Sequence, residues 1–214
     1  MFSAIPTQEE MLHALEERHG RELQQKISSA SAAVCGLGGL GSNIAISLAR
    51  AGIGSLHIID FDCVDISNLN RQQYFPDQLG MPKTEALGST LRRIAPYCRI
   101  TADTVKLTAD NIPDLLCSDD IILEAFDRAE EKAILVNTVL EQLPDKYLIS
   151  GSGMAGMGSA NSIVTRRIMK RFYLCGDGES DVSGGMGLIA SRVAVCAAHQ
   201  AHMALRIIAG EYNV

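Results

Sequence analysis

The sequence predicts an α/β fold in which a largely parallel sheet is covered by helices on both faces. Short apolar segments typical of buried strands alternate along the chain with longer segments that have helical periodicity. A glycine-rich turn also joins the first expected strand directly to a helix, which is common in this fold class. The chain has 214 residues, of which 47% are hydrophobic, so we expect one domain with a sizeable core.

An N-terminal helical segment, residues 1–30, precedes this alternation. The stretch from residue 7 to residue 30 has helical periodicity and many charges, and it predicts one or two helices. Its apolar residues are expected to face inward: Met11, Leu12, Leu15, Leu23 and Ile27.

The elements of the main domain, residues 31–214, are expected to follow in order. The first helix is entered from Gly41 and ends near Gly52, because glycine is a common helix terminator. The next helix has Pro82 near its start, where a missing N–H group costs little. Strands are expected at residues 31–36, 55–60, 99–107, 120–127 and 146–152, and helices at 42–52, 81–96, 128–143 and 188–210.

Charge and composition exclude several classes of protein. The net charge of −6 argues against a general nucleic-acid binder. No apolar run fits a secretory signal or a membrane span, so we expect a cytoplasmic protein with no membrane partner. One basic cluster is either a solvated face, which we favour, or a site for an acidic partner: Arg166, Arg167, Lys170 and Arg171.

The glycine-rich turn predicts a nucleotide site. Gly36, Gly38 and Gly41 form a G-x-G-x-x-G motif between a strand and a helix, and Gly39 removes one more side chain. Glycine allows a tight turn and a close approach of phosphate oxygens to the N–H groups at the helix start. Asp60 ends the next strand, where a carboxylate accepts hydrogen bonds from ribose hydroxyls. These features predict a Rossmann-like nucleotide-binding domain.

The polar loop after Asp60 favours a triphosphate over a dinucleotide. In an NAD-dependent dehydrogenase another helix is expected soon after this strand, whereas here a long loop carries amides and cations. Such groups suit a triphosphate under attack, because they neutralise its charge. A solvated loop with ordinary charges is the simpler alternative. The residues concerned are Asp62, Asn68, Asn70, Arg71 and Lys83.

Four motifs resemble those of the ThiF/MoeB/HesA family, which is related to ubiquitin-activating enzymes. They are "GLGGLGS", "IIDFDCVDISNLNRQ", "GMPKTEAL" and "AFDRAEEK", and the resemblance spans about residues 20 to 210. Within the family the chain is most similar to the short ThiF subfamily, whose members adenylate the sulfur carrier ThiS in thiamine biosynthesis. The resemblance implies that residues 31–214 form a ThiF-type adenylation domain with a mixed sheet, assembled as a homodimer.

The same resemblance implies a mechanism with ATP and Mg²⁺, in which the C-terminal glycine of a ubiquitin-like carrier becomes an acyl-adenylate. Asp127 corresponds to the magnesium ligand of the family, although its spacing alone is equally typical of a helix N-cap. Arg71 and Lys83 would be catalytic through charge stabilisation, together with Asp127. The residues expected to contact ATP are Gly36, Gly38, Gly39, Gly41, Asp60, Asp62, Asn68, Arg71 and Lys83.

The chain departs from the family in three respects. It has no paired C-x-x-C motif among its six cysteines, so no zinc is expected. The stretch 176–187 has no cysteine to link with the carrier, and Cys175 or Cys196 are alternatives, although ordinary buried thiols are favoured. The N-terminal arginine motif of the family is also missing; Arg18 or Arg21 would be substitutes, with surface arginines the simpler interpretation.

Other interpretations remain open at the level of sequence. The stretch 150–162, rich in glycine and serine, is either a close-packed turn or the floor of a groove for a Gly-Gly tail. An NAD-dependent oxidoreductase and a non-catalytic carrier-binding scaffold are alternatives from other classes. Within the family, a MoeB-like enzyme or one that activates a transfer RNA base is also compatible.

Overall fold

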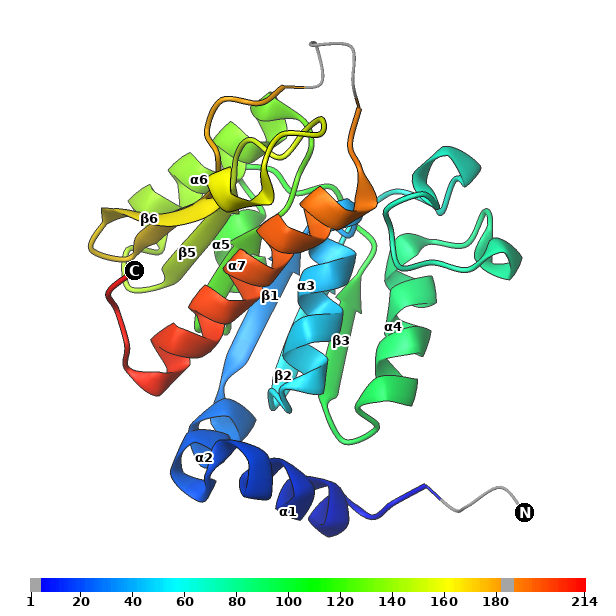
Figure 1. The fold of residues 1–214 in the computed structure, drawn as a ribbon, viewed down its shortest axis with the longest axis vertical. Coiled ribbons are helices and arrows are strands. Elements are labelled where there is room, and N and C mark those ends of the chain that lie inside the picture. Colours follow the sequence, from blue (N-terminus) through cyan, green and yellow to red (C-terminus); the bar gives the residue numbers. More distant parts are fainter. Residues whose placement is uncertain (1–4, 182–186) are drawn as a thin grey trace.

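A single mixed sheet organises the computed structural model, which describes residues 5–181 and 187–214. Its strand order is β3-β2-β1-β4-β5-β7-β6, and only the pair β6–β7 is antiparallel (Figure 1). The predicted α/β fold with a mostly parallel sheet is confirmed. The strands are β1 (Ser31–Cys35), β2 (Ser55–Ile59), β3 (Arg99–Asp103), β4 (Ile121–Glu124), β5 (Tyr147–Gly151), β6 (Val164–Met169) and β7 (Phe172–Gly176).

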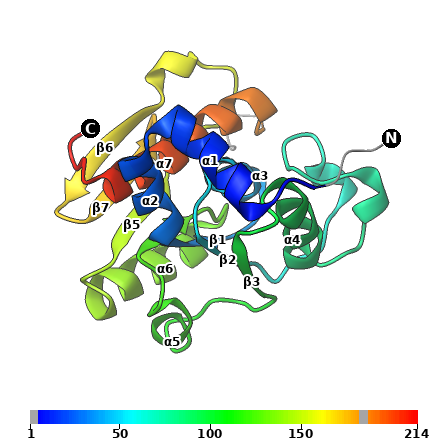
Figure 2. The ribbon, with the colours of Figure 1, turned by 90° about the horizontal axis from the view of Figure 1, so that it is seen from below.

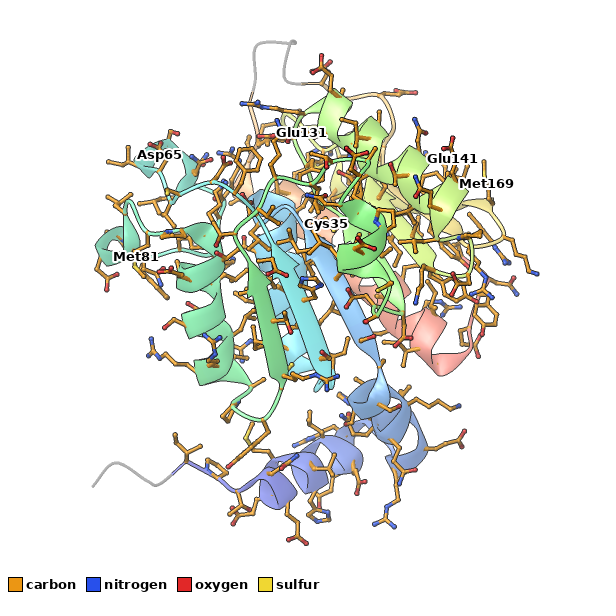
Figure 3. All side chains as sticks on the ribbon, turned by 180° about the vertical axis from the view of Figure 1, so that it is seen from behind. Cys35, Asp65, Met81, Glu131, Glu141 and Met169 are labelled. Atoms are coloured by element: carbon orange, nitrogen blue, oxygen red, sulfur yellow. The ribbon has the colours of Figure 1, made fainter. Side chains whose placement is uncertain are left out.

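Helices cover both faces of this sheet (Figures 1 and 3). Side chains alternate along β1, so Val34 belongs to one apolar core, whereas Ala33 and Cys35 belong to the other. Burial on both faces explains why the central strands β1, β2 and β4 are nearly continuous apolar runs. One face carries α3 (Gly39–Arg50), α4 (Lys83–Ile94) and α7 (Ala190–Ala209), and the other carries α5 (Ile112–Leu116) and α6 (Ala129–Gln142).

The N-terminal segment forms two helices, α1 (Gln8–His19) and α2 (Arg21–Ser29), beneath the amino ends of the strands (Figure 2). Ile27 is buried against the core, as predicted. Leu12 is 37% exposed, so its predicted inward orientation is wrong. The reason is that α1 packs on the surface and contains no buried residue. Met11, Leu15 and Leu23 are half-buried.

Four elements differ most from the sequence prediction. The helix α5 and the hairpin β6–β7 were not predicted, and the strand expected at 99–107 ends at Asp103. The basic cluster lies on this hairpin, on the far side of the molecule from the loop that carries Asp65 (Figure 3, where Met169 marks the hairpin). The stretch expected to lack a reactive cysteine, 176–187, falls partly outside the described residues. Across the described ranges, no helix is long and apolar enough to cross a membrane.

His57 is buried in the sheet between two carboxylates. Its Nε2 lies 2.8 Å from Asp103 Oδ2, and its Nδ1 lies 3.0 Å from Asp119 Oδ2. Burial acts to lower the pKa of His57, but the hydrogen bonds and charges of Asp119 and Asp103 outweigh it, so the pKa is raised. With an acceptor at each ring nitrogen, the doubly protonated imidazolium is the favoured form.

This arrangement predicts a pH-dependent contribution of His57 to stability. Because the folded pKa lies above the unfolded value of about 6.5, the contribution is complete below that pH and is lost as pH rises through the folded pKa. We expect the difference in free energy of unfolding between the native protein and His57→Gln to shrink from pH 6 upward. Urea unfolding of both proteins at several pH values measures it, and a difference independent of pH would contradict the interpretation.

Candidate nucleotide-binding site

A cavity of about 590 Å³ opens at the carboxyl edge of the sheet, beyond the ends of β1, β2 and β4. Figure 3 marks this edge by Cys35, the last residue of β1, with Glu131 and Asp65 of the cavity wall beyond it. Strand order reverses at β1, and ligands of open α/β sheets bind at such a point. Gly41 and the polar-loop residue Asn70 do not line the cavity. The other predicted residues do: Gly36, Gly38, Gly39, Asp60, Asp62, Asn68, Arg71, Lys83 and Asp127.

Two glycines of the motif, Gly36 and Gly41, are required by the backbone geometry of the turn. Gly36 has φ +90°, a conformation that favours glycine. A Cβ at Gly41 would lie 1.8 Å from the Gly36 carbonyl oxygen, so only glycine lets α3 approach the turn. Gly41 lies outside the cavity lining. The structure therefore gives Gly41 a packing role, and its predicted contact with the nucleotide stays a prediction.

The remaining glycines leave room in front of the helix N-terminus. Gly38 is the N-cap of α3, which begins at Gly39, and both line the cavity. We name residues 36–39 the phosphate turn. A Cβ at Gly38 would have Gln72 Nε2, at 3.7 Å, as its nearest neighbour, so the space there is open. The free N–H groups and the positive dipole end of α3 suit an anion.

Asp60 and Lys83 form a buried charged group in the cavity. The carboxylate of Asp60 accepts hydrogen bonds from the N–H groups of Leu37 at 2.6 Å and Asp62 at 2.8 Å. Lys83 Nζ lies 2.9 Å from Asp62 Oδ2 and 3.8 Å from Asp60 Oδ2. Burial raises the pKa of Asp60, against the opposing effects of the Lys83 charge and these N–H groups.

Arg71 and Gln72 line this cavity, and each has one buried polar atom that is unpaired among the described residues. Arg71 donates to Asn70 Oδ1 at 2.9 Å, and Gln72 donates to Asn68 Oδ1 at 2.7 Å. Arg71 Nε and Gln72 Oε1 are buried and have no hydrogen-bond partner among the described residues. Buried polar atoms are rarely left unsatisfied, so these two are exceptions in the loop that carries them. The sequence reasoning missed Gln72, although it directly follows Arg71 in the loop motif.

Asp127 lies exposed at the edge of the cavity. The N-cap of α6 is Arg128, so the alternative that Asp127 caps this helix is wrong. Beside it, Lys132 pairs with the fully buried Glu124 and donates to the Gly151 carbonyl oxygen at 2.7 Å. The sequence analysis did not predict this pair. Its only sign in the sequence is a carboxylate, Glu124, at the end of an expected strand.

The side opposite the phosphate turn, named here the far wall, consists of residues 151–155 and 178–181. Its first segment falls within the stretch interpreted as a turn or groove floor, and it does line the cavity. The later part, Ala160–Ser162, is a short 3-10 helix away from the cavity. Phe61 and Phe126, missed by sequence reasoning, add two aromatic rings to the lining.

The cysteines divide into buried and exposed groups. Cys175 and Cys196 are fully buried, and burial raises the pKa of their thiols to about 11 and about 12. Such thiols are unreactive, which supports the favoured interpretation. Cys63 is exposed and lines the cavity, but the sequence reasoning did not single it out. Arg18 and Arg21 are both exposed on the N-terminal helices.

The sequence matches the ThiF family over residues 12–214. The chain belongs to this family. This ThiF-family protein is 31% identical over 194 residues to the molybdopterin-synthase adenylyltransferase of Salmonella typhimurium, which covers 88% of this chain and 76% of that protein. It is 35% identical over 120 residues to the tRNA threonylcarbamoyladenosine dehydratase of Escherichia coli, which covers 55% of this chain and 45% of the relative. The matching region thus spans about half the length of that relative.

Solved structures of the same kind share the fold. The E. coli tRNA N6-threonylcarbamoyladenosine dehydratase in complex with ATP superposes with a TM-score of 0.86 and 22% identity, covering 97% of this chain and 98% of that one. The E. coli MccB structure with ATP gives a TM-score of 0.66 at 21% identity, covering 93% and 64%. These likenesses show that the chain shares the Rossmann-like α/β fold of these structures.

Proposed function

We propose that this ThiF-family protein is an ATP-dependent adenylyltransferase that activates the C-terminal glycine of a ubiquitin-like sulfur carrier of the ThiS type. The observation that carries the proposal is the single cavity in which the phosphate turn, Asp60, Arg71, Lys83 and Asp127 meet. Its volume lies in the range of small-molecule sites, and its polar groups converge from separate loops.

The reaction needs a carboxylate, an electrophilic phosphorus and charge stabilisation. A carboxylate oxygen of the carrier attacks the α-phosphorus, a new O–P bond forms, and the bond to the bridging oxygen of pyrophosphate breaks. Arg71 and Lys83 neutralise the negative charge that grows during the attack, and Asn68 helps to hold the phosphates. Because the carrier supplies the nucleophile, catalysis is alignment and electrostatics, with no activated serine or cysteine.

The other cavity residues hold the nucleotide. Asp60 accepts hydrogen bonds from the ribose, and the N–H groups at Gly38 and Gly39 face the phosphates. Asp127 would hold Mg²⁺ through its carboxylate, a hard oxygen ligand of the kind that this ion prefers. The described residues contain no cluster of three metal ligands, so one carboxylate and the phosphates would share this role. The metal would supply charge neutralisation.

The small side chains of the far wall favour a peptide as the substrate that accepts the adenylate. Residues 151–155 carry small side chains apart from Met154, and Gly153 and Gly178 have positive φ angles. A glycine tail threaded along such a wall leaves its carboxylate facing the phosphate turn. The expected homodimer and cytoplasmic location accompany this proposal.

The deciding experiment mixes the protein with candidate carriers and ATP–Mg²⁺, and looks by mass spectrometry for a carrier that has gained an adenylate. Thermal-shift measurements with ATP–Mg²⁺ and with NAD separate adenylation from the oxidoreductase alternative. Stabilisation by NAD alone would contradict the proposal, and binding of ATP without any adenylated carrier would favour a scaffold or another substrate.

A transfer RNA substrate is the second candidate. The likeness to the E. coli dehydratase extends over almost the whole of both chains, and that protein acts on tRNA by its name. In addition, the hairpin β6–β7 exposes a basic cluster that an RNA backbone would complement: Arg166, Arg167 and Lys170. Pyrophosphate release that depends on added tRNA, and not on a carrier, would favour this candidate over the first.

Asp60→Ala is expected to weaken ATP binding on the order of 10- to 100-fold, the loss typical of a hydrogen bond to a charged group. Asp120→Ala is a matched control, because that carboxylate also accepts a backbone hydrogen bond, from Ser31 N–H at 2.9 Å, at the opposite edge of the sheet. Titration calorimetry measures both affinities. Unchanged affinity in a folded Asp60→Ala variant would remove Asp60 from the site.

A further inference from the structure

The first turn of α7 contacts both sides of the cavity through two consecutive residues. Val193 packs on the phosphate turn, where a Cβ at Gly39 would lie 3.0 Å from its Cγ1. Arg192 points instead to the segments that carry the far wall. Successive residues of a helix project about 100° apart, so one rigid turn of helix spans the two sides. The spacing between them therefore depends on what holds Arg192.

Arg192 is only 6% exposed and binds three separate places. Its Nη1 donates to the carbonyl oxygens of Gly158 at 2.5 Å and Ser159 at 2.6 Å. Its Nη2 donates to Ser162 Oγ at 3.2 Å and pairs with the carboxylate of Asp177. The guanidinium thus joins the loop after residue 155 to the segment before residue 178.

Asp177, which Arg192 holds in place, is in turn hydrogen-bonded to the backbone of the far wall. Its Oδ1 accepts hydrogen bonds from the N–H groups of Glu179 and Ser180, both at 2.9 Å. Ser180 Oγ in turn accepts from Ala155 N–H at 3.1 Å. A Cβ at Gly153 would lie 2.0 Å from Asp177 Oδ1, so the two segments are in direct contact. Burial alone would raise the pKa of Asp177, but these hydrogen bonds hold it at about 2, so the group is charged at neutral pH.

Stability alone does not explain the position of this ion pair, although the lowered pKa of Asp177 shows that its hydrogen bonds favour the folded state at neutral pH. A cation in the first turn of a helix faces the positive end of the helix dipole. Burying a charged pair also removes both groups from water, and such pairs are often no more stable than apolar replacements. Furthermore, Arg192 Nε is buried with no hydrogen-bond partner in the described part of the chain. What the pair provides is a fixed geometry for the far wall.

We propose that Arg192 and Asp177 are positioning residues that hold the far wall at the distance from the phosphate turn that an acyl group on the nucleotide requires. Neither residue touches the reacting atoms; they act through residues 152–155 and 178–181. Misplacement of a reactant by about 1 Å costs on the order of 100-fold, so a fixed wall has a large effect on the reaction. The inference rests on the proposed function, because it takes the far wall as the acceptor side.

The test compares two ligands that share a nucleotide and differ in the acyl part. These are AMP and 5′-O-(N-glycylsulfamoyl)adenosine, a stable analogue of a glycyl adenylate. We expect the native protein to bind the analogue about 100-fold more tightly than AMP, as is usual for intermediate-like ligands. Arg192→Lys and the milder Asp177→Asn should each lose about 10- to 100-fold of this preference, while their affinity for AMP stays within about twofold.

Arg206→Lys is the matched control, because this arginine lies in the last turn of the same helix and donates to the Asn213 carbonyl oxygen, away from the cavity. It should keep the full preference. If the Arg192 and Asp177 variants keep it too, or lose affinity for both ligands equally, the positioning role is wrong. If the native protein itself shows no preference, the far wall is not an acyl site, and the proposed function fails with the inference.

Discussion

Arg71→Ala is expected to reduce carrier-dependent ATP–pyrophosphate exchange by about 100- to 1,000-fold, the usual effect of losing one charge-stabilising contact in a water-poor site. Arg71 lines the cavity, and its aliphatic stem lies beside Gly39, where a Cβ on the glycine would be 3.3 Å from Arg71 Cγ. If the charge it neutralises grows during the attack, the loss of ATP affinity should be smaller than the loss of rate. Isotope exchange measures the rate, and calorimetry measures the affinity.

Lys83→Ala should reduce exchange on a similar scale, with an added structural effect. Its removal leaves Asp60 and Asp62 without their buried counter-charge, so thermal stability must be measured alongside. Arg50→Ala, at the exposed end of α3, removes the same charge far from the cavity and should leave exchange unchanged. Near-normal exchange in both the Arg71 and Lys83 variants would refute adenylation at this site.

Gly41→Ala is expected to destabilise the fold by about 3 kcal/mol or more, the upper range for inserting an atom into a packed region. The new Cβ would lie 1.8 Å from the Gly36 carbonyl oxygen and 2.9 Å from its carbon, and neither backbone atom can move without opening the turn. For a chain of this size such a loss lowers the melting temperature by roughly 6–12 °C. Calorimetric melting measures it.

Gly38→Ala is the variant to compare with Gly41→Ala. It should leave stability almost unchanged and weaken ATP binding instead. Its φ of −73° suits any residue, and the nearest atom to an added Cβ is 3.7 Å away, so stability should change by no more than about 0.5 kcal/mol. The methyl group would, however, occupy the space where we place the phosphates, and ATP affinity should fall. Equal melting temperatures for the two variants would show that the turn tolerates a wider approach of α3.

The central strands and the phosphate turn could be predicted because local sequence determines them. The apolar runs of β1, β2 and β4 are buried on both faces, and the glycine spacing allows only a tight strand-to-helix turn. Most ligand-facing residues predicted from that turn and its loop do line the cavity. Gly41 does not line it and packs against the Gly36 carbonyl oxygen instead, a position that the motif alone does not reveal.

The remaining parts depend on contacts between distant residues. The strand β6 lies at the edge of the sheet and carries exposed Arg166 and Arg167, so it lacks the apolar pattern of a strand. The pair of Arg192 and Asp177 joins positions whose relation only the folded chain reveals. In α1, Leu12 matches the helical period, but no neighbouring element covers it.

The packing of α7 on α3 determines when, during folding, the wall of the cavity is completed. These helices form one of the most extensive contacts in the fold, although about 150 residues separate them along the chain. A nascent chain that ends before Ala190 has the whole phosphate turn but lacks Val193 against Gly39. Contacts between segments so far apart along the chain, such as those of α3 with α7, form slowly. Until α7 has docked, the phosphate turn therefore lacks one of the side chains that pack against it, so the two ends of this domain must meet before the wall of the cavity is complete.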